Sequence, residues 1–206
     1  MVRGCFIGTG ADGVTAAGNG LAGIEVGSGD GSLIGGLEAG DANVIADNQT
    51  MGVCVGSISL TARANAILGN AIHDNGELGI DLGDDGVTPN DAGDTDTGPN
   101  DRQNFPVLTK AEVGNSGPTV AGYLESLPDT QFLIEFFGNR ACDLSGHGEG
   151  QVLLGRALVT TGSAGRADFE QPVAGSLNDT MSVTATATRV RPGEDPFLAR
   201  VALHSL

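Results

Sequence analysis

Hydrophobic and polar positions alternate in a pattern that recurs three times in the first part of the chain. Each copy starts with Asn, has Gly four residues later, and continues with an aliphatic residue, any residue, a second aliphatic residue and Gly. The copies NGLAGIEVG, NQTMGVCVG and NGELGIDLG start at Asn19, Asn48 and Asn75, which lie 29 and 27 residues apart. Short alternation is typical of a β-strand with one buried side, and a fixed period of this length is typical of a solenoid.

This repeat predicts how the strands pack. One such strand cannot bury its apolar side alone, so the aliphatic pair of each copy must stack on the equivalent pair of the next copy. We therefore expect a right-handed parallel β-helix of about three turns over residues 1–83. The stacked pairs are Ile24 and Val26, Val53 and Val55, and Ile80 and Leu82.

The asparagine that opens each copy has a structural explanation. Asparagine tolerates the left-handed backbone of a bend, and amide side chains stacked from turn to turn can hydrogen-bond to one another. We expect Asn19, Asn48 and Asn75 to form such a ladder. A ligand-binding role for these residues is the alternative.

A different pattern covers residues 105–206, where short alternating stretches are separated by turn residues. Seven strands of this length predict an antiparallel β-sandwich of immunoglobulin-like shape, so the fold class is all-β. The expected strands are 105–113, 118–126, 130–138, 151–161, 165–173, 180–190 and 196–203.

The third of these stretches has apolar residues on both of its faces. Phe132, Ile134 and Phe136 share one face and are expected to anchor the core of the sandwich. Leu133 and Phe137 share the other face with Glu135, which predicts that both faces are partly covered. The residues expected opposite the first face are Val183, Ala185 and Ala187.

Charge is spread unevenly along the chain, whose formal net charge is −16. Residues 1–101 contain 15 Asp and Glu against Arg3 and Arg63, whereas residues 102–206 contain 11 against 8 basic residues. An acidic surface repels phosphate backbones, anionic lipids and uronic-acid polymers. We therefore expect no nucleic-acid partner and no membrane insertion, and a polysaccharide partner would be neutral rather than anionic.

Neither a disulfide framework nor a membrane span is predicted. The chain has three cysteines, an odd number, and they are widely spaced without a CxxC pair: Cys5, Cys54 and Cys142. No apolar run is long enough to cross a bilayer, and the first residues lack the charged-then-apolar plan of an export signal. If the protein is exported, we expect the signal to lie upstream of this chain.

An acidic linker loop, residues 84–104, joins the two patterns. From Asp74 to Asp101 there are nine acidic residues and no Lys or Arg. Calcium prefers several carboxylate and carbonyl oxygens in a flexible loop, so calcium is the candidate cofactor and no organic cofactor is expected. The alternative is a solvated linker whose Asp and Asn side chains cap turns. The candidate ligands are Asn90, Asp91, Asp94, Asp96, Asn100 and Asp101.

Two carboxylates of the coil form a catalytic candidate. In the expected register, Glu25, Cys54 and Asp81 point away from the core as an external column, with Glu25 and Asp81 about 10 Å apart. Paired carboxylates can hydrolyse glycosides, one as acid and the other as base. Chance placement in an acidic chain is the alternative. His147, in the loop SGHGEG, belongs to the sandwich and shares no column with these carboxylates.

The repeats resemble those of bacterial right-handed parallel β-helix proteins, the broad group that includes pectate-lyase-like enzymes and many large secreted or surface-attached proteins. The run GNAIHDNGELGIDLGDDGVTPNDAGDTDTGPNDRQNFPVLT, followed by FLIEFFGN and CDLSGHGEG, is similar to a recurrent ending of such surface proteins. In that ending the coil gives way to a β-sandwich. The last segment, RVRPGEDPFLARVALHSL, departs from the usual pattern.

Several functions are compatible with these features. The first is a structural or carbohydrate-binding module of a secreted or cell-surface protein, which implies an extracellular location. The alternative is a glycan-active enzyme of the glycoside hydrolase or polysaccharide lyase type that uses Glu25 and Asp81. A hydrolase of another bond, built from the same carboxylates or from His147, has no motif. Because the first coil turn leaves backbone groups unpaired, we expect a second copy, as a homo-oligomer, or upstream sequence to cover that end.

Overall fold

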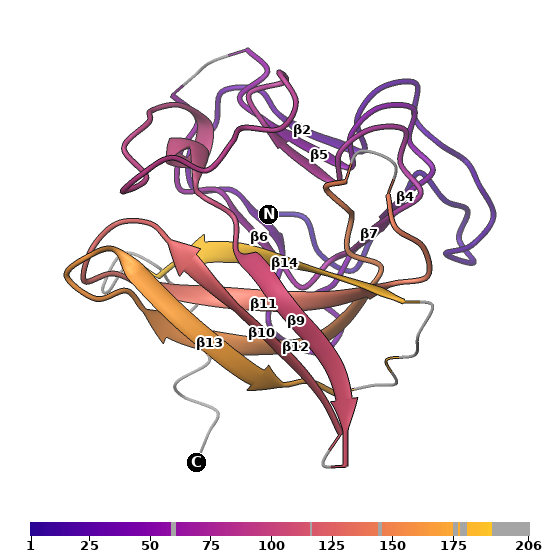
Figure 1. The fold of residues 1–206 in the computed structure, drawn as a ribbon. Helices are drawn as coiled ribbons and strands as arrows, with labels where there is room; N and C mark the ends of the chain where they lie inside the picture. The colour runs from indigo at the N-terminus through magenta and orange to yellow at the C-terminus, as the bar shows by residue number, and fades with distance from the viewer. Residues whose placement is uncertain (59–60, 116, 144–145, 175–176, 178–180, 191–206) are drawn as a thin grey trace.

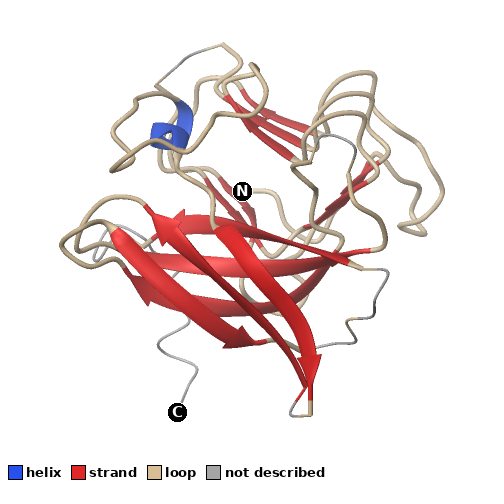
Figure 2. Cartoon of the chain, in the orientation of Figure 1, coloured by secondary structure: helices blue, strands red, loops and turns tan. Residues whose placement is uncertain are grey.

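The fold consists of β-strands arranged in parallel and antiparallel sheets (Figures 1 and 2). It is given by a computed structural model of the 206-residue chain, which describes residues 1–58, 61–115, 117–143, 146–174, 177 and 181–190. These described residues contain fourteen strands and one short 3₁₀ element, η1 (Pro99–Arg102). The predicted all-β class is therefore confirmed.

Short parallel strands stack in three sheets over the first 82 residues. One sheet has the order β1 (Phe6–Ile7), β4 (Val44–Ala46), β7 (Ala71–His73). The second has the order β2 (Ile24–Val26), β5 (Val53–Val55), β8 (Ile80–Leu82). The third pairs β3 (Leu33–Gly35) with β6 (Ala66–Leu68). We call this stack of turns the coil.

The repeat sets the register of the coil. Ile24 pairs with Val53, and Val53 pairs with Ile80, so the predicted alignment of these three residues is confirmed. Their side chains join one apolar cluster in which Val53 and Ile45 are fully buried. Burial of stacked aliphatic side chains supplies the main favourable contribution to the stability of such turns.

Glycine ends several of these strands because the next turn lies too close for a side chain. Gly8 and Gly35 have φ values of +83° and +79°. A Cβ atom at Gly8 would lie 1.9 Å from the carbonyl oxygen of Ala46, and one at Gly35 would lie 2.0 Å from that of Leu68. The motif of two apolar residues followed by Gly therefore has a steric cause.

Longer antiparallel strands form two sheets after residue 106. The first has the order β13 (Arg166–Pro172), β10 (Gly117–Glu125), β9 (Val107–Gly114). The second has the order β12 (Val152–Thr160), β11 (Gln131–Asn139), β14 (Ser182–Arg189). Six of the seven expected strands are thus present; the seventh, expected at 196–203, lies outside the described residues.

One apolar cluster fills the space between these two sheets. Phe132, Ile134 and Phe136 of β11 are fully buried in it, together with Val120 and Leu124 of β10. The neighbouring residues of β14 that pack on this cluster are those expected from the sequence, namely Val183, Ala185 and Ala187.

The opposite face of β11 lies against the coil, so both faces of this strand are covered. Leu133 is only 5% exposed and packs in a cluster with Leu33, Ala66 and Leu68 of the coil. Beside it, Glu135 is fully buried and accepts hydrogen bonds from Gly69 N, at 3.0 Å, and from Arg156 Nε, at 2.7 Å. Burial raises the pKa of Glu135.

Truncation of Leu133 tests how much this junction contributes to stability. Leu133→Ala should lower the free energy of unfolding by about 2–5 kcal/mol, because it leaves a cavity between the sheet and the coil. The matched control is Leu158→Ala, since Leu158 pairs with Leu133 across β11 and β12 but is 58% exposed. Urea unfolding measures both, and equal losses would contradict a packed junction.

Candidate functional site

Three aspartates of the linker meet in one cluster. The carboxylate oxygens that Asp91, Asp94 and Asp96 offer lie within 4.8 Å of one another. We call these three residues the aspartate cluster. The segment that carries them runs from the end of the coil to the start of β9, beside the strand β10 that ends at Glu125.

Asp94 is the most firmly held member of the aspartate cluster. It is buried, and its Oδ1 accepts the backbone N–H of Asn104 at 3.0 Å. Its Oδ2 accepts hydrogen bonds from Gln103 Nε2, at 2.8 Å, and from the Ser126 hydroxyl. Burial raises the pKa of Asp94 despite these donors. The cluster is therefore tied to the end of β10.

Two carboxylate oxygens of the aspartate cluster are buried without a hydrogen-bond partner, namely Asp91 Oδ1 and Asp96 Oδ1. The other oxygen of Asp91 accepts the N–H and the hydroxyl of Thr95, at 3.1 and 2.9 Å. Burial, and then the charge of Asp91, raise the pKa of Asp96. Buried carboxylate oxygens without donors are expensive, and a cation is the partner that would satisfy two at once.

The other three expected metal ligands have different partners. Asn90 exchanges two hydrogen bonds with the backbone of Phe105, at 2.8 and 2.9 Å. Asn100 accepts the N–H of Asn65, and Asp101 forms an ion pair with Arg63 at 3.1 Å. The structure thus brings together three of the six candidates.

Asn104 orients the aspartate cluster, and sequence reasoning missed it. Its Oδ1 accepts the N–H of Asp91 at 3.1 Å, while its Nδ2 donates to the carbonyl oxygens of Asp91 and Glu125, each at 2.8 Å. Asn104 is buried. Its position outside the alternating Asp and Asn residues explains why spacing alone gave no signal.

The catalytic candidates, Glu25 and Asp81, occupy equivalent positions in the register of the coil but differ in their exposure to solvent. Glu25 pairs with Cys54, and Cys54 pairs with Asp81, as expected. Only Glu25 is exposed; Cys54 and Asp81 are 3% and 2% exposed. The expectation of an external column is therefore wrong for these two residues.

Local folding of the chain after β8 explains why Asp81 is covered. Its two carboxylate oxygens accept the N–H groups of Asp84 and Gly86, at 3.0 and 2.9 Å. Burial raises the pKa of Asp81, and burial followed by nearby carboxylates raises that of Cys54 to about 11. Cys54 is thus a protonated thiol at neutral pH.

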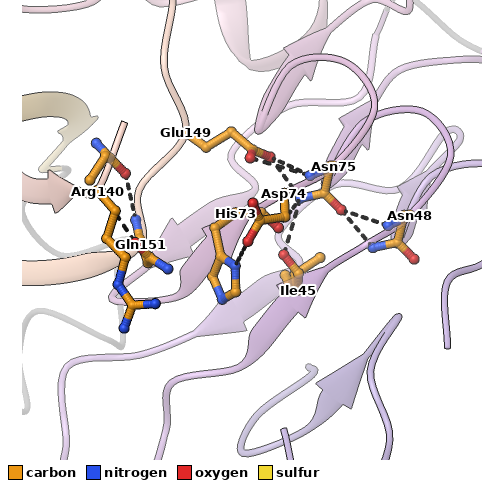
Figure 3. Close-up of polar contacts among 9 residues, drawn as sticks. Ile45, Asn48, His73, Asp74, Asn75, Arg140, Glu149 and Gln151 are labelled. Atoms are coloured by element: carbon orange, nitrogen blue, oxygen red, sulfur yellow. Dashed lines mark hydrogen bonds and ion pairs between the residues drawn. The ribbon is translucent and has the colours of Figure 1, made fainter. Parts of the chain in front are cut away.

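The asparagines at the start of each repeat are connected from turn to turn, and Figure 3 shows the step from Asn48 to Asn75. The backbone N–H and the Nδ2 of Asn19 both donate to Asn48 Oδ1, at 3.2 and 2.8 Å. Asn48 donates in the same way to Asn75 Oδ1, at 3.1 and 2.8 Å. A second ladder, from Asn43 to Asn70, repeats this geometry and was not expected from the sequence.

Glu149 takes the place of the next asparagine where the first ladder ends (Figure 3). The N–H of Asn75 lies 3.3 Å from each carboxylate oxygen of Glu149, and Asn75 Nδ2 donates to Oε1 at 2.7 Å. The adjacent Gly150 exchanges two backbone hydrogen bonds of 2.8 Å with Ile72 of β7. The loop before β12 therefore supplies acceptors that a fourth turn would otherwise supply.

His147 lies in the same loop as Glu149. Its ring packs edge-on against Phe105, with the ring centroids 5.5 Å apart. On the coil, the side chains of His73 and Asp74 approach to 2.7 Å beside Asn75 (Figure 3). The described part of the chain contains no helix long and apolar enough to cross a membrane.

Replacement of Glu149 separates its role as an acceptor from its charge. Glu149→Ala leaves two donors of Asn75 without their partner, so the free energy of unfolding should fall by about 1–3 kcal/mol. Glu149→Gln keeps an acceptor oxygen and should retain most of the stability. The control is Glu77→Ala, because Glu77 is exposed. Urea unfolding measures each; equal effects of the Gln and Ala variants would contradict the acceptor role.

The contribution of Glu149 to the free energy of unfolding should change with pH in a definite direction. Burial raises the pKa of Glu149, so the folded chain binds this proton more tightly than the unfolded chain. The corresponding stability is present below the unfolded pKa and lost as pH rises through the raised value. Glu149→Gln should therefore reduce the loss of stability that occurs as pH rises above about 4, the ordinary pKa of a glutamate side chain. An unchanged pH profile would show that Glu149 has no raised pKa.

Comparisons with known proteins do not assign the chain to a family. No protein-family description matches it, and no curated protein is similar to it. The candidate sites therefore rest on their own geometry: a cluster of three aspartates with unpartnered oxygens, and a ladder that a glutamate completes.

Proposed function

We propose that the chain is a structural module of a secreted or cell-surface protein, in which calcium binds at the aspartate cluster. In this proposal the coil is a short right-handed parallel β-helix, and the six described antiparallel strands belong to an immunoglobulin-like sandwich that closes its C-terminal end. The shared register of three turns and the hydrogen bonds of Glu149 support this description.

The two buried, unpartnered oxygens of Asp91 and Asp96 carry the calcium proposal. A single ion between them would bind both oxygens and offset the repulsion of three neighbouring carboxylates. None of the three takes part in an ion pair among the described residues; the charge of Arg102 acts on Asp96 without direct contact, while burial and the charge of Asp91 still raise the pKa of Asp96.

The donor set favours calcium over other divalent ions. All three candidate ligands are carboxylates, whereas zinc sites are usually built from Cys and His. Magnesium requires a near-ideal octahedron with short bonds, while calcium accepts irregular oxygen sets with six to eight ligands. Backbone carbonyls and water would complete the shell.

An exported protein would meet calcium concentrations that saturate such a site. Extracellular modules bind calcium with dissociation constants of about 10⁻⁴ to 10⁻³ M. The strongly acidic charge of the chain also suits a solvent-facing protein outside the cell. Glycan binding and glycan cleavage stay predictions from the sequence, because none of the contacts described above favours either one.

Thermal unfolding tests the calcium proposal directly. At pH 7, calcium at about 2 mM should raise Tm by about 4–7 °C, as expected for a chain of this size and a dissociation constant of about 10⁻⁴ M. Magnesium at the same concentration should have a smaller effect. Asp96→Asn should abolish the calcium shift, whereas Asp129→Asn, in an exposed turn, should preserve it.

Acidic pH should weaken the calcium effect. The raised pKa values of Asp94 and Asp96 mean that protonation favours the folded state, and this contribution is lost as pH rises through those values. At neutral pH, bound calcium offsets the stability that is lost when these carboxylates ionise. Near pH 4, protons neutralise the carboxylates, so calcium should then stabilise the fold less. Absence of both a calcium-dependent Tm and a calorimetric binding heat at pH 7 would overturn the proposal.

A further inference from the structure

A cavity of about 810 Å³ lies between the last turn of the coil and the sheet that contains β14. Its floor consists of aliphatic side chains from the last turn, namely Ile67, Ile72, Ile80 and Leu82. The linker residues Phe105 to Leu108, the loop of Glu149 and the strand β14 line the remaining sides. Ligand cavities of proteins have volumes of about 300–1,000 Å³ and occur preferentially where two structural units meet.

The cavity exists because the end of the coil is closed at its edges but not over its centre. In the middle turn, Val53 and Val55 are fully buried between the turns on either side. Their equivalents in the last turn, Ile80 and Leu82, remain partly exposed. Glu149 and Gly150 satisfy backbone and amide donors of this turn without covering its apolar interior.

Strand β14 contributes a polar group to this apolar space. Ala185 and Ala187 face the core of the sandwich, so Thr184, Thr186 and Thr188 point to the side of the coil. The Thr184 hydroxyl donates to the carbonyl oxygen of Glu149 at 2.6 Å. The Thr186 hydroxyl is buried without a hydrogen-bond partner, and the residue lines the cavity.

We propose that this cavity binds a neutral, mainly apolar small molecule whose single polar group hydrogen-bonds to the Thr186 hydroxyl. The aliphatic floor provides the contact area, and a ligand would supply the partner that the hydroxyl lacks. An anionic ligand is disfavoured, because the whole chain is acidic and more acidic than basic residues line the cavity. The charged lining residues are Asp94, Asp101 and Glu149 against Arg102 and Arg189. Asp94 belongs to both the cavity lining and the aspartate cluster, but the proposal rests on Thr186 and the aliphatic floor and not on the unpartnered oxygens of Asp91 and Asp96.

Binding of the neutral dye Nile red to the full chain measures occupancy of the cavity. We expect its fluorescence to rise with saturation, and Thr186→Phe to reduce the affinity at least about tenfold by filling the space. Thr160→Phe is the matched control, because Thr160 is exposed at the end of β12 and does not line the cavity. Circular dichroism and Tm establish that each variant is folded.

A pair of competitors tests the hydroxyl itself without a change of volume. The ratio of the toluene to the benzyl alcohol concentration that displaces half of the dye measures the preference for the alcohol. Thr186→Val, which keeps the shape, should lower this ratio about threefold to tenfold, the difference that one hydrogen bond provides, while retaining dye binding. Thr160→Val should leave the ratio unchanged.

Three results would overturn the proposal. They are no saturable dye binding by the wild-type chain, equal dye binding by wild type and a folded Thr186→Phe, and a toluene to benzyl alcohol ratio that is the same in wild type and Thr186→Val. All three are measured without added calcium, so they are distinguishable from failure of the calcium proposal.

Discussion

Pairing of the backbone and amide donors at the end of the coil is the constraint on which the rest of the structure depends. Within the coil, neighbouring turns exchange hydrogen bonds in both directions: Asn48 donates to Asn75, and the N–H of Gly76 donates back to the carbonyl oxygen of Asn48. The last turn has no successor, and a buried donor without a partner costs about 1–3 kcal/mol. Residues far along the chain provide the missing acceptors, namely Asn100, Glu135, Glu149 and Gly150.

This way of ending the coil makes the two parts of the molecule mutually dependent. Glu135 projects from the middle of β11, so its contact with Gly69 places the sheet over the coil beside the cluster at Leu133. Asn100 fixes the linker against Asn65, which directly precedes β6, the strand that Gly69 follows. The linker ahead of Asn100 carries the aspartate cluster, and the cavity lies between the last turn and the sheet that contains β14.

The sequence allowed the register of the coil to be predicted because identical chemistry recurs in each turn. Alternation placed Ile24, Val53 and Ile80 in one column, and the column is observed. Alternation likewise identified both covered faces of β11, since Leu133 and Phe137 are apolar on the side opposite Phe136.

Features that depend on distant partners were not predictable. Glu149 lies 74 residues from Asn75, and Asn100 lies 35 residues from Asn65, so no local pattern marks either as an acceptor. The spacing of Asp91, Asp94 and Asp96 suggested a metal site, but Asn90 and Asn100 resemble ligands in sequence while serving the backbone. Asp81 is covered because the chain folds back after β8, which alternation does not encode.

Amide hydrogen exchange of the last coil turn tests this account most directly. If acceptors from beyond the coil complete the stack, the N–H groups of Asn65, Gly69 and Asn75 should be protected to about the same degree as those of Asn43 and Asn48 in the preceding turn. Exchange of the three last-turn amides at unprotected rates, with Asn43 and Asn48 still protected, would contradict it.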